Sequence, residues 1–149
     1  MEHKHGRTGE LVVVTTLTRL YDGATLCLTE RQDLIYRGAA SRPTDAAPPL
    51  ARTFSPDVPL HAAGEGTWGL HTDPTLLMRF SAATANTHRI HYDWPYATGV
   101  EAYPGLVVHG PLMSLLLAEV ARLSGVTDVA SVKHRNLAPL FCGDPAQLL

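Results

Sequence analysis

Residues 109–125 read HGPLMSLLLAEVARLSG and form the most apolar stretch of this chain of 149 residues. Over 110–123 apolar side chains cover almost every direction around a helix, and Gly125 suits the end of that helix because glycine readily adopts the left-handed conformation found there. A helix that is apolar nearly all round must be surrounded by other structure. We therefore expect a buried central helix over 110–123.

Two segments rich in β-branched residues, 10–20 and 24–36, flank the turn residues Tyr21-Asp22-Gly23 and predict a β-hairpin. From Gly38 to Gly66 the chain becomes rich in alanine and proline, and proline lacks the amide donor that a strand ladder needs. A connection of about thirty residues usually joins separate units. The predicted organisation is a terminal hairpin at 1–37, a linker at 38–66 and a second unit at 67–149.

Two further elements are predicted around the central helix. Asp73 or Thr72 can cap a helix that begins at Pro74 and runs to about residue 84, because its apolar residues have helical spacing. Residues 126–140 alternate polar and apolar side chains well enough for a strand. A sheet that wraps a central helix needs more strands than this second unit offers, so the sheet looks incomplete.

Charge and hydropathy exclude several classes of function. Twelve Lys and Arg against 14 Asp and Glu give a net charge of −2, and no basic stripe is present that would neutralise a nucleic-acid backbone. The N-terminal residues carry no apolar segment typical of a signal peptide, and charged residues interrupt the longest apolar stretch. We expect a soluble, cytoplasmic protein with neither a nucleic-acid nor a membrane partner.

The residues with the most specific chemistry lie in FSAATANTHRIHYD, residues 80–93, followed by His109-Gly110 at the start of the central helix. Adding water to an unsaturated thioester requires a base for the water, an acid for the α-carbon and donors for the carbonyl oxygen. His91 can supply the first two. Asn86 can hold the water but is not basic. The backbone N–H of Gly110, at the positive end of the helix dipole, suits the oxyanion.

Other interpretations of these residues remain open. His88 is interpreted as an exposed or structurally satisfied residue, and His109 can cap its helix, pack under the site or take part directly in catalysis. His88 and His91 with Asp93 or His109 resemble a metal-ligand set, but no cysteine joins them and the H-E-x-x-H pattern is absent, so we expect no metal. Ser81 and Ser114 are considered as nucleophiles, but both lack the G-x-S-x-G context of a serine hydrolase.

The run 80–93, with PYA at 95–97 and YPGLVVHGP at 103–111, resembles one branch of the MaoC-like (R)-specific enoyl-CoA hydratases and dehydratases. This branch includes mitochondrial 3-hydroxyacyl-thioester dehydratases and bacterial mesaconyl-CoA (3-methylfumaryl-CoA) and itaconyl-CoA hydratases. The wider group has the turn S-G-D-x-N-P-x-H-x-D, whose histidine falls on His91 and whose aspartate falls on Asn86. In this branch asparagine is the ordinary residue there. The resemblance covers about residues 68–144.

The resemblance implies an α+β hot-dog fold, in which an antiparallel sheet wraps a long helix. Such proteins often carry two hot-dog units, so residues 1–37 look like the last hairpin of a first unit. They also continue through further strands after Asp144. We therefore expect a second unit that lacks its C-terminal strands, in a chain that is a piece of a longer protein.

The implied activity is that of an acyl-CoA hydratase or dehydratase, a hydro-lyase acting on a thioester such as mesaconyl-CoA or itaconyl-CoA. His91 would act as general acid and base, Asn86 would position the water and the Gly110 amide would bind the thioester oxygen. The implied substrate-binding residues are Arg79, Arg89, His109 and Tyr96, the two arginines for a carboxylate or the phosphates of coenzyme A.

The resemblance implies no cofactor other than the coenzyme A of the substrate, and a homodimer. An alternative is a non-catalytic or truncated hot-dog subunit that binds an acyl thioester or a partner chain. A thioesterase on the same fold is disfavoured, because the residues follow the hydratase turn.

Overall fold

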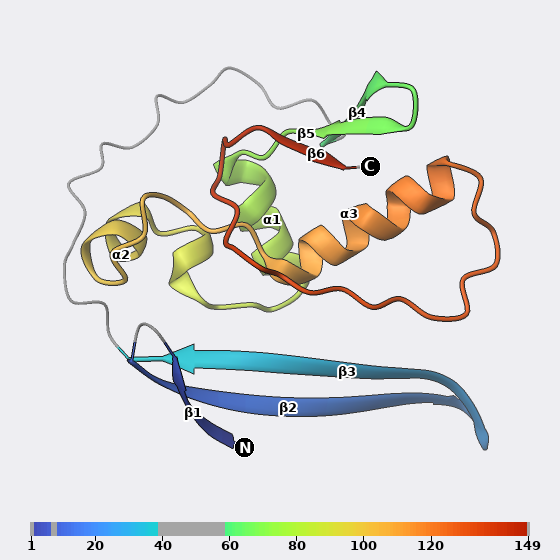
Figure 1. Ribbon diagram of the computed structural model, residues 1–149, viewed down its shortest axis with the longest axis horizontal. Helices are drawn as coiled ribbons and strands as arrows, with labels where there is room; N and C mark the ends of the chain where they lie inside the picture. Colours follow the sequence, from blue (N-terminus) through green and yellow to red (C-terminus); the bar gives the residue numbers. More distant parts are fainter. Residues whose placement is uncertain (1, 7–8, 39–58, 149) are drawn as a thin grey trace. The chain divides into compact units, whose positions relative to one another are not determined.

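The computed structural model describes residues 2–6, 9–38 and 59–148 (Figure 1). The chain divides into two compact units, Met1–Ala40 and Ser41–Leu149. Both contain antiparallel sheet, and the helices belong to the second unit, which gives the mixed α and β class expected from the sequence. In the described part of the chain, no helix has the length and apolar character needed to cross a membrane.

The first unit is a three-stranded antiparallel sheet in the order β1-β2-β3, with β1 at Glu2–Gly6, β2 at Gly9–Asp22 and β3 at Thr25–Arg37. The predicted hairpin is confirmed. Asp22 pairs with Thr25, so the two-residue turn is Gly23-Ala24, and Gly23 has the positive φ of 58° that such turns require. Strand β1 was not predicted, since its residues are mostly polar and carry no apolar alternation.

The second unit contains a short sheet in the order β4-β5-β6, with β4 at Leu60–Gly64, β5 at Thr67–Leu70 and β6 at Ala146–Leu148. Strand β4 lies inside the range predicted as linker, so that prediction was wrong for residues 60–64. The proline-rich composition ends at Pro59, and beyond it nothing prevents a ladder. Residues 39–58 of the predicted linker lie outside the described residues.

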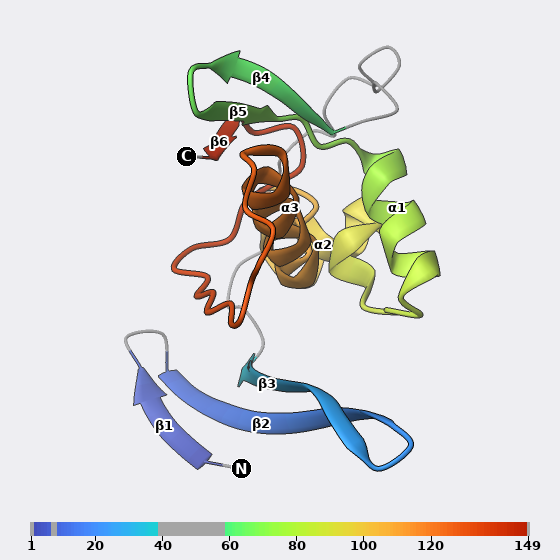
Figure 2. The ribbon, with the colours of Figure 1, turned by 90° about the vertical axis from the view of Figure 1, so that its right-hand side faces the viewer.

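Four helical segments follow β5: α1 at Pro74–Ala83, the 3₁₀ turn η1 at Arg89–His91, α2 at Trp94–Gly99 and α3 at Gly110–Leu123 (Figures 1 and 2). The predicted start of α1 is confirmed, because the Asp73 carboxylate accepts a hydrogen bond of 2.7 Å from the backbone N–H of Leu76. Thr72, the other candidate cap, is buried and its hydroxyl accepts from the Gly143 N–H.

Helix α3 has the predicted bounds but only one buried side. Leu112, Leu116 and Val120 enter the core with residues of β4, β5 and α1, whereas Leu115 is 59% exposed. The expectation of a helix surrounded on all sides is therefore wrong for the described chain, because three short strands cover only one face. Gly125, with φ of 87°, ends the helix as predicted.

Residues 126–140 form no strand in the described structure, so the predicted strand was wrong. A single bridge joins Val107 to Phe141 just beyond this segment. Alternating β-branched residues favour a strand only where a neighbouring strand supplies hydrogen bonds and packing, and the described residues place none beside this segment. Val129 and Val132 are accordingly more than half exposed.

Candidate active site

Helix α1 leads directly into the turn that holds the candidate histidines. The helix ends at Ala83 with Thr84 as its C-cap, and Ala85 follows with a positive φ of 52°, which reverses the chain. The side-chain oxygen of Asn86 then accepts a hydrogen bond of 3.0 Å from the backbone N–H of His88. This local bond stabilises the turn before η1, as asparagine side chains commonly do.

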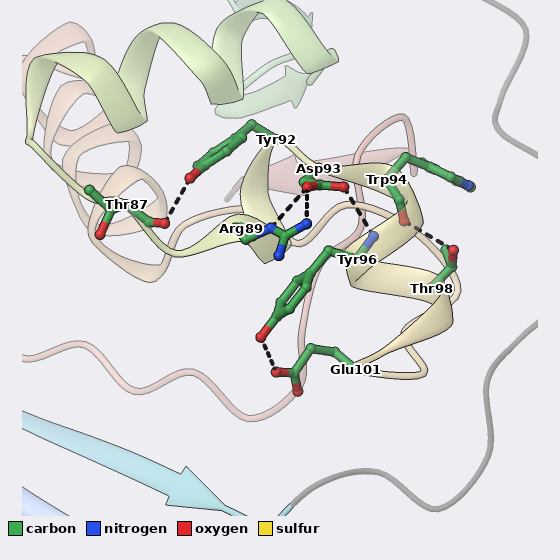
Figure 3. A network of polar contacts seen from close by, with 8 residues as sticks. All are labelled: Thr87, Arg89, Tyr92, Asp93, Trp94, Tyr96, Thr98 and Glu101. Atoms are coloured by element: carbon green, nitrogen blue, oxygen red, sulfur yellow. Dashed lines mark hydrogen bonds and ion pairs between the residues drawn. The ribbon is translucent and has the colours of Figure 1, made fainter.

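A polar network holds η1 against α2 (Figure 3). Arg89 donates two hydrogen bonds, of 2.9 and 2.7 Å, to one oxygen of Asp93, whose other oxygen caps α2 by accepting from the Tyr96 N–H. The Arg89 guanidinium also lies 4.3 Å from the centre of the Tyr96 ring, whose hydroxyl donates to Glu101. The Tyr96 N–H, followed by Arg89, lowers the pKa of Asp93. The network fixes the turn that carries His91.

His91 is buried, with 7% of its surface exposed. Its Nδ1 lies 2.6 Å from the backbone carbonyl of Val107. A carbonyl can only accept, so Nδ1 carries the proton and the neutral ring has its lone pair on Nε2. Burial lowers the pKa of His91, against a raising effect of the Val107 carbonyl and a further lowering by His88. His91 is thus a neutral imidazole with a basic Nε2 at neutral pH.

His109 lies directly beneath His91. It occupies the N-cap position of α3, but its side chain makes no capping bond and is fully buried. The two imidazole rings stack with centroids 3.6 Å apart and planes within 16°. The Nε2 of His109 is 2.8 Å from the Ser81 hydroxyl. Burial, followed by the charge of His91, lowers the pKa of His109 to about 4. Of the alternatives for His109, the structure supports packing under the site.

Gly110 begins α3 immediately after this histidine. A Cβ at this position would lie 2.6 Å from the side-chain nitrogen of Asn136, so the amide of Asn136 reaches the first turn of the helix. The segment that carries Asn136 is attached to α3 by a hydrogen bond of 2.6 Å between Ser114 and His134. The first backbone N–H groups of the helix have no partner within the helix itself, and a side-chain amide lies beside them.

The structure brings some of the candidate residues together and separates others. His91, His109 and Gly110 form one group, and Asn86 lies in the turn that leads to them. Arg89 and Tyr96 contact each other in the neighbouring network. Arg79 is exposed on α1. Residues two apart in a helix point about 200° apart, so Arg79 points away from Ser81 and the histidine pair.

Sequence reasoning missed three groups that shape the site: the Ser81 hydroxyl, the Val107 carbonyl and the Asn136 amide. Ser81 lies inside the 80–93 run but was considered only as a nucleophile. The other two give no signal in a single sequence, because a carbonyl belongs to every residue and Asn136 lies in a segment interpreted as strand. Across the described ranges, no three His, Cys, Asp or Glu side chains gather to hold a metal ion.

The fold and this site define an α+β protein with a buried, neutral histidine beside a helix N-terminus, which is an arrangement suited to moving a proton next to a polarised carbonyl. The family model for hydroxyacyl-thioester dehydratase type 2 matches residues 1–142. The chain belongs to this family.

Individual relatives agree with this family. The chain is 44% identical over 146 residues to mesaconyl-C(4)-CoA hydratase of Chloroflexus aurantiacus, a match that covers 98% of this chain and 49% of that protein. It is 31% identical over 134 residues to the mitochondrial hydroxyacyl-thioester dehydratase type 2 of Schizosaccharomyces pombe, covering 87% of this chain and 41% of that protein. The chain thus spans half or less of the length of these curated relatives.

Proposed function

We propose that this chain carries the catalytic histidine and carbonyl-binding amide of an enoyl-thioester hydratase, a hydro-lyase. The observation that carries the proposal is His91, whose Nδ1 donates to the Val107 carbonyl and whose Nε2 is therefore a base, next to the N-terminus of α3. The names of the two relatives, a hydratase and a dehydratase, describe the two directions of one reaction and support the same class.

In the hydration direction, the Nε2 of His91 takes a proton from a water molecule while the water oxygen bonds to the β-carbon of the substrate. The electron pair of the double bond shifts toward the carbonyl, and negative charge develops on the thioester oxygen. The Gly110 N–H and the dipole of α3 stabilise that charge. The proton now on His91 is then delivered to the α-carbon, which restores the neutral ring and completes the addition of water.

In this scheme Asn86 binds and positions the water. Its side-chain oxygen is already used by the His88 N–H, so its NH₂ group is the part left to donate to a water oxygen. A water held in this way keeps both of its own hydrogens available, and the proposal has one of them pass to His91. Asn86 is accordingly a water-binding residue in the proposal, and proton transfer falls to His91 alone.

We propose a small unsaturated dicarboxylic acyl-CoA, such as mesaconyl-CoA or itaconyl-CoA, as the substrate. The support is the 44% identity to a protein named for mesaconyl-C(4)-CoA. Arg89 is a better candidate than Arg79 for a substrate carboxylate or phosphate, because it shares η1 with His91. Its pair with Asp93 uses Nε and one Nη, which leaves the other Nη for a ligand.

The finer structural assignments are proposals of the same kind. The packing of α3 against an antiparallel sheet supports a hot-dog fold for the second unit. We further propose a homodimer in the cytoplasm, with no cofactor beyond the coenzyme A of the substrate and no metal.

The test is hydration of mesaconyl-CoA, itaconyl-CoA and crotonyl-CoA by the purified chain. The reaction is measured as the loss of the enoyl absorbance. His91→Gln is expected to lower turnover by a factor of about 10² to 10⁴, as expected for loss of a general base. His61→Gln, at an exposed histidine of β4, is the matched control and should leave turnover unchanged. Turnover by the His91→Gln variant close to that of the unaltered chain contradicts the proposal.

A further inference from the structure

We propose that His109 is a positioning residue: its buried ring, anchored by Ser81, forms the flat wall against which His91 is held in the orientation that its reaction requires. The inference rests on the proposed function of His91 and extends it to two residues that do not contact the substrate. It is carried by the geometry of the two imidazole rings and by their partners.

Two contacts together fix the His91 ring. The hydrogen bond from Nδ1 to the Val107 carbonyl, 2.6 Å long, holds one edge of the ring. The stack on His109, with centroids 3.6 Å apart and an angle of 16°, fixes the plane of the ring. A ring held at one edge and on one face has no free rotation about its side-chain bonds, so Nε2 points to one place. Removal of either contact restores a degree of freedom.

Contacts with two residues of α1 hold the His109 ring in one position. Its Nε2 lies 2.8 Å from the Ser81 hydroxyl on α1, and its ring meets the edge of Phe80 with centroids 4.8 Å apart. No part of it is exposed. Its Nδ1 has no hydrogen-bond partner within the described residues. A buried polar atom without a partner costs free energy, and such costs are commonly retained where the group serves a function.

The stacked pair holds at most one proton at a time, and the proton taken up during the reaction goes to His91. Two positive rings stacked at this distance repel each other, and burial already disfavours a charge on His109. Charge on His109 is thus suppressed first by burial and then by the charge of His91. During the reaction His109 remains neutral, and a neutral ring can lie against the imidazolium that forms on His91 without repelling it.

The other charged groups around His91 do not replace this role. His88, at 5.9 Å between ring centroids, is the titratable neighbour on the preceding turn and lowers the pKa of His91. Arg89 and Asp93 are paired with each other. From α1, the groups facing the histidine pair are the uncharged Phe80 and Ser81. From α2, Tyr96 is bonded to Glu101 and stacked under Arg89.

The experiment compares His109→Ala, His109→Phe and Ser81→Ala in the full chain. The pKa of His91 is measured by NMR of the imidazole resonances without substrate, and kcat and KM are measured for mesaconyl-CoA. In His109→Ala the wall is lost and water reaches the ring, so the pKa of His91 should rise toward 6.5 and kcat should fall at least about tenfold, with KM changed less than about twofold. His109→Phe keeps a flat buried ring, so the lowered pKa of His91 should be retained and kcat should stay within about twofold of the unaltered chain.

Ser81→Ala should change the pKa of His91 and kcat in the same direction as His109→Ala, but by less. In this variant the His109 ring stays in place but lacks its hydrogen bond to Ser81. A His109→Ala chain that remains folded with an unchanged His91 pKa and kcat overturns the proposal. So does a His109→Phe chain that behaves like His109→Ala. If the unaltered chain hydrates no thioester, the proposed function fails, and the NMR measurement still decides whether His109 controls His91.

Discussion

Replacement of His109 by phenylalanine should remove most of the dependence of this unit's stability on pH between 6.5 and 4. In the folded chain the pKa of His109 is about 4, against 6.5 for an exposed histidine, so the unfolded chain binds a proton more readily. The contribution of neutral His109 to stability is therefore fully present above pH 6.5 and is lost as the pH falls toward about 4. The difference in pKa corresponds to about 3 kcal/mol of unfolding free energy.

The assay is urea unfolding at several pH values between 7.5 and 4.5, followed by tryptophan fluorescence. Trp68 and Trp94, the two tryptophans of the chain, are both partly buried against the core of the second unit and so report on that unit. The unaltered chain should lose stability steadily as the pH falls, with a slope of at most about 1.4 kcal/mol per pH unit from one group. His109→Phe keeps a buried ring but cannot titrate.

A residual slope is expected in His109→Phe, because burial also lowers the pKa of His91 and contributes in the same direction. The carboxylates whose pKa values are lowered, such as Asp93, lose their contribution only at lower pH, below about 4. His61→Gln removes an exposed histidine and serves as the control with an unchanged slope. An unchanged slope in His109→Phe would refute the assignment of His109 as a buried neutral ring.

Three further predictions test the core, a helix cap and the helix N-terminus. Leu77→Ala should lower the unfolding free energy by about 2–5 kcal/mol, since this side chain is fully buried in the core, and an effect below about 1 kcal/mol in urea unfolding would contradict that burial. Asp73→Ala should cost about 1 kcal/mol by loss of the α1 cap, whereas Asp73→Asn retains an acceptor and should cost less, as thermal unfolding will show. Gly110→Ala should reduce hydration because the new Cβ lies 2.6 Å from the Asn136 amide. In an Asn136→Ala background the same substitution should cost less, and equal losses in both backgrounds would show that this contact does not matter.

Local signals in the sequence predicted much of the fold. The hairpin of β2 and β3 follows from Asp22-Gly23 between two β-branched runs, α1 from Asp73 before Pro74, and the end of α3 from Gly125. Each of these signals acts through residues that are neighbours in the chain. The strand predicted at 126–140 and the all-round burial of α3 depend instead on which segments lie alongside, and a single sequence does not contain that information.

The candidate site divides in the same way. His91 and Gly110 were found from a run of residues whose types and spacing suit the chemistry. The partner of each ring was not found, because the Val107 carbonyl lies 16 residues from His91 and Ser81 lies 28 residues from His109. Burial of His109 was likewise not readable from its polar type. These contacts are what make His91 a neutral base, so the structure adds the protonation state to a residue that the sequence had located.

The most direct test of the central claim, that neutral His91 is the base of a hydratase site, is the pH dependence of kcat/KM for mesaconyl-CoA hydration. Activity should fall on the acid side with an apparent pKa below 6.5, equal to the pKa of His91 measured by NMR. The His91→Gln variant should lose this limb together with nearly all turnover. An acid limb that persists in His91→Gln, or one that does not coincide with the titration of His91, would contradict the claim.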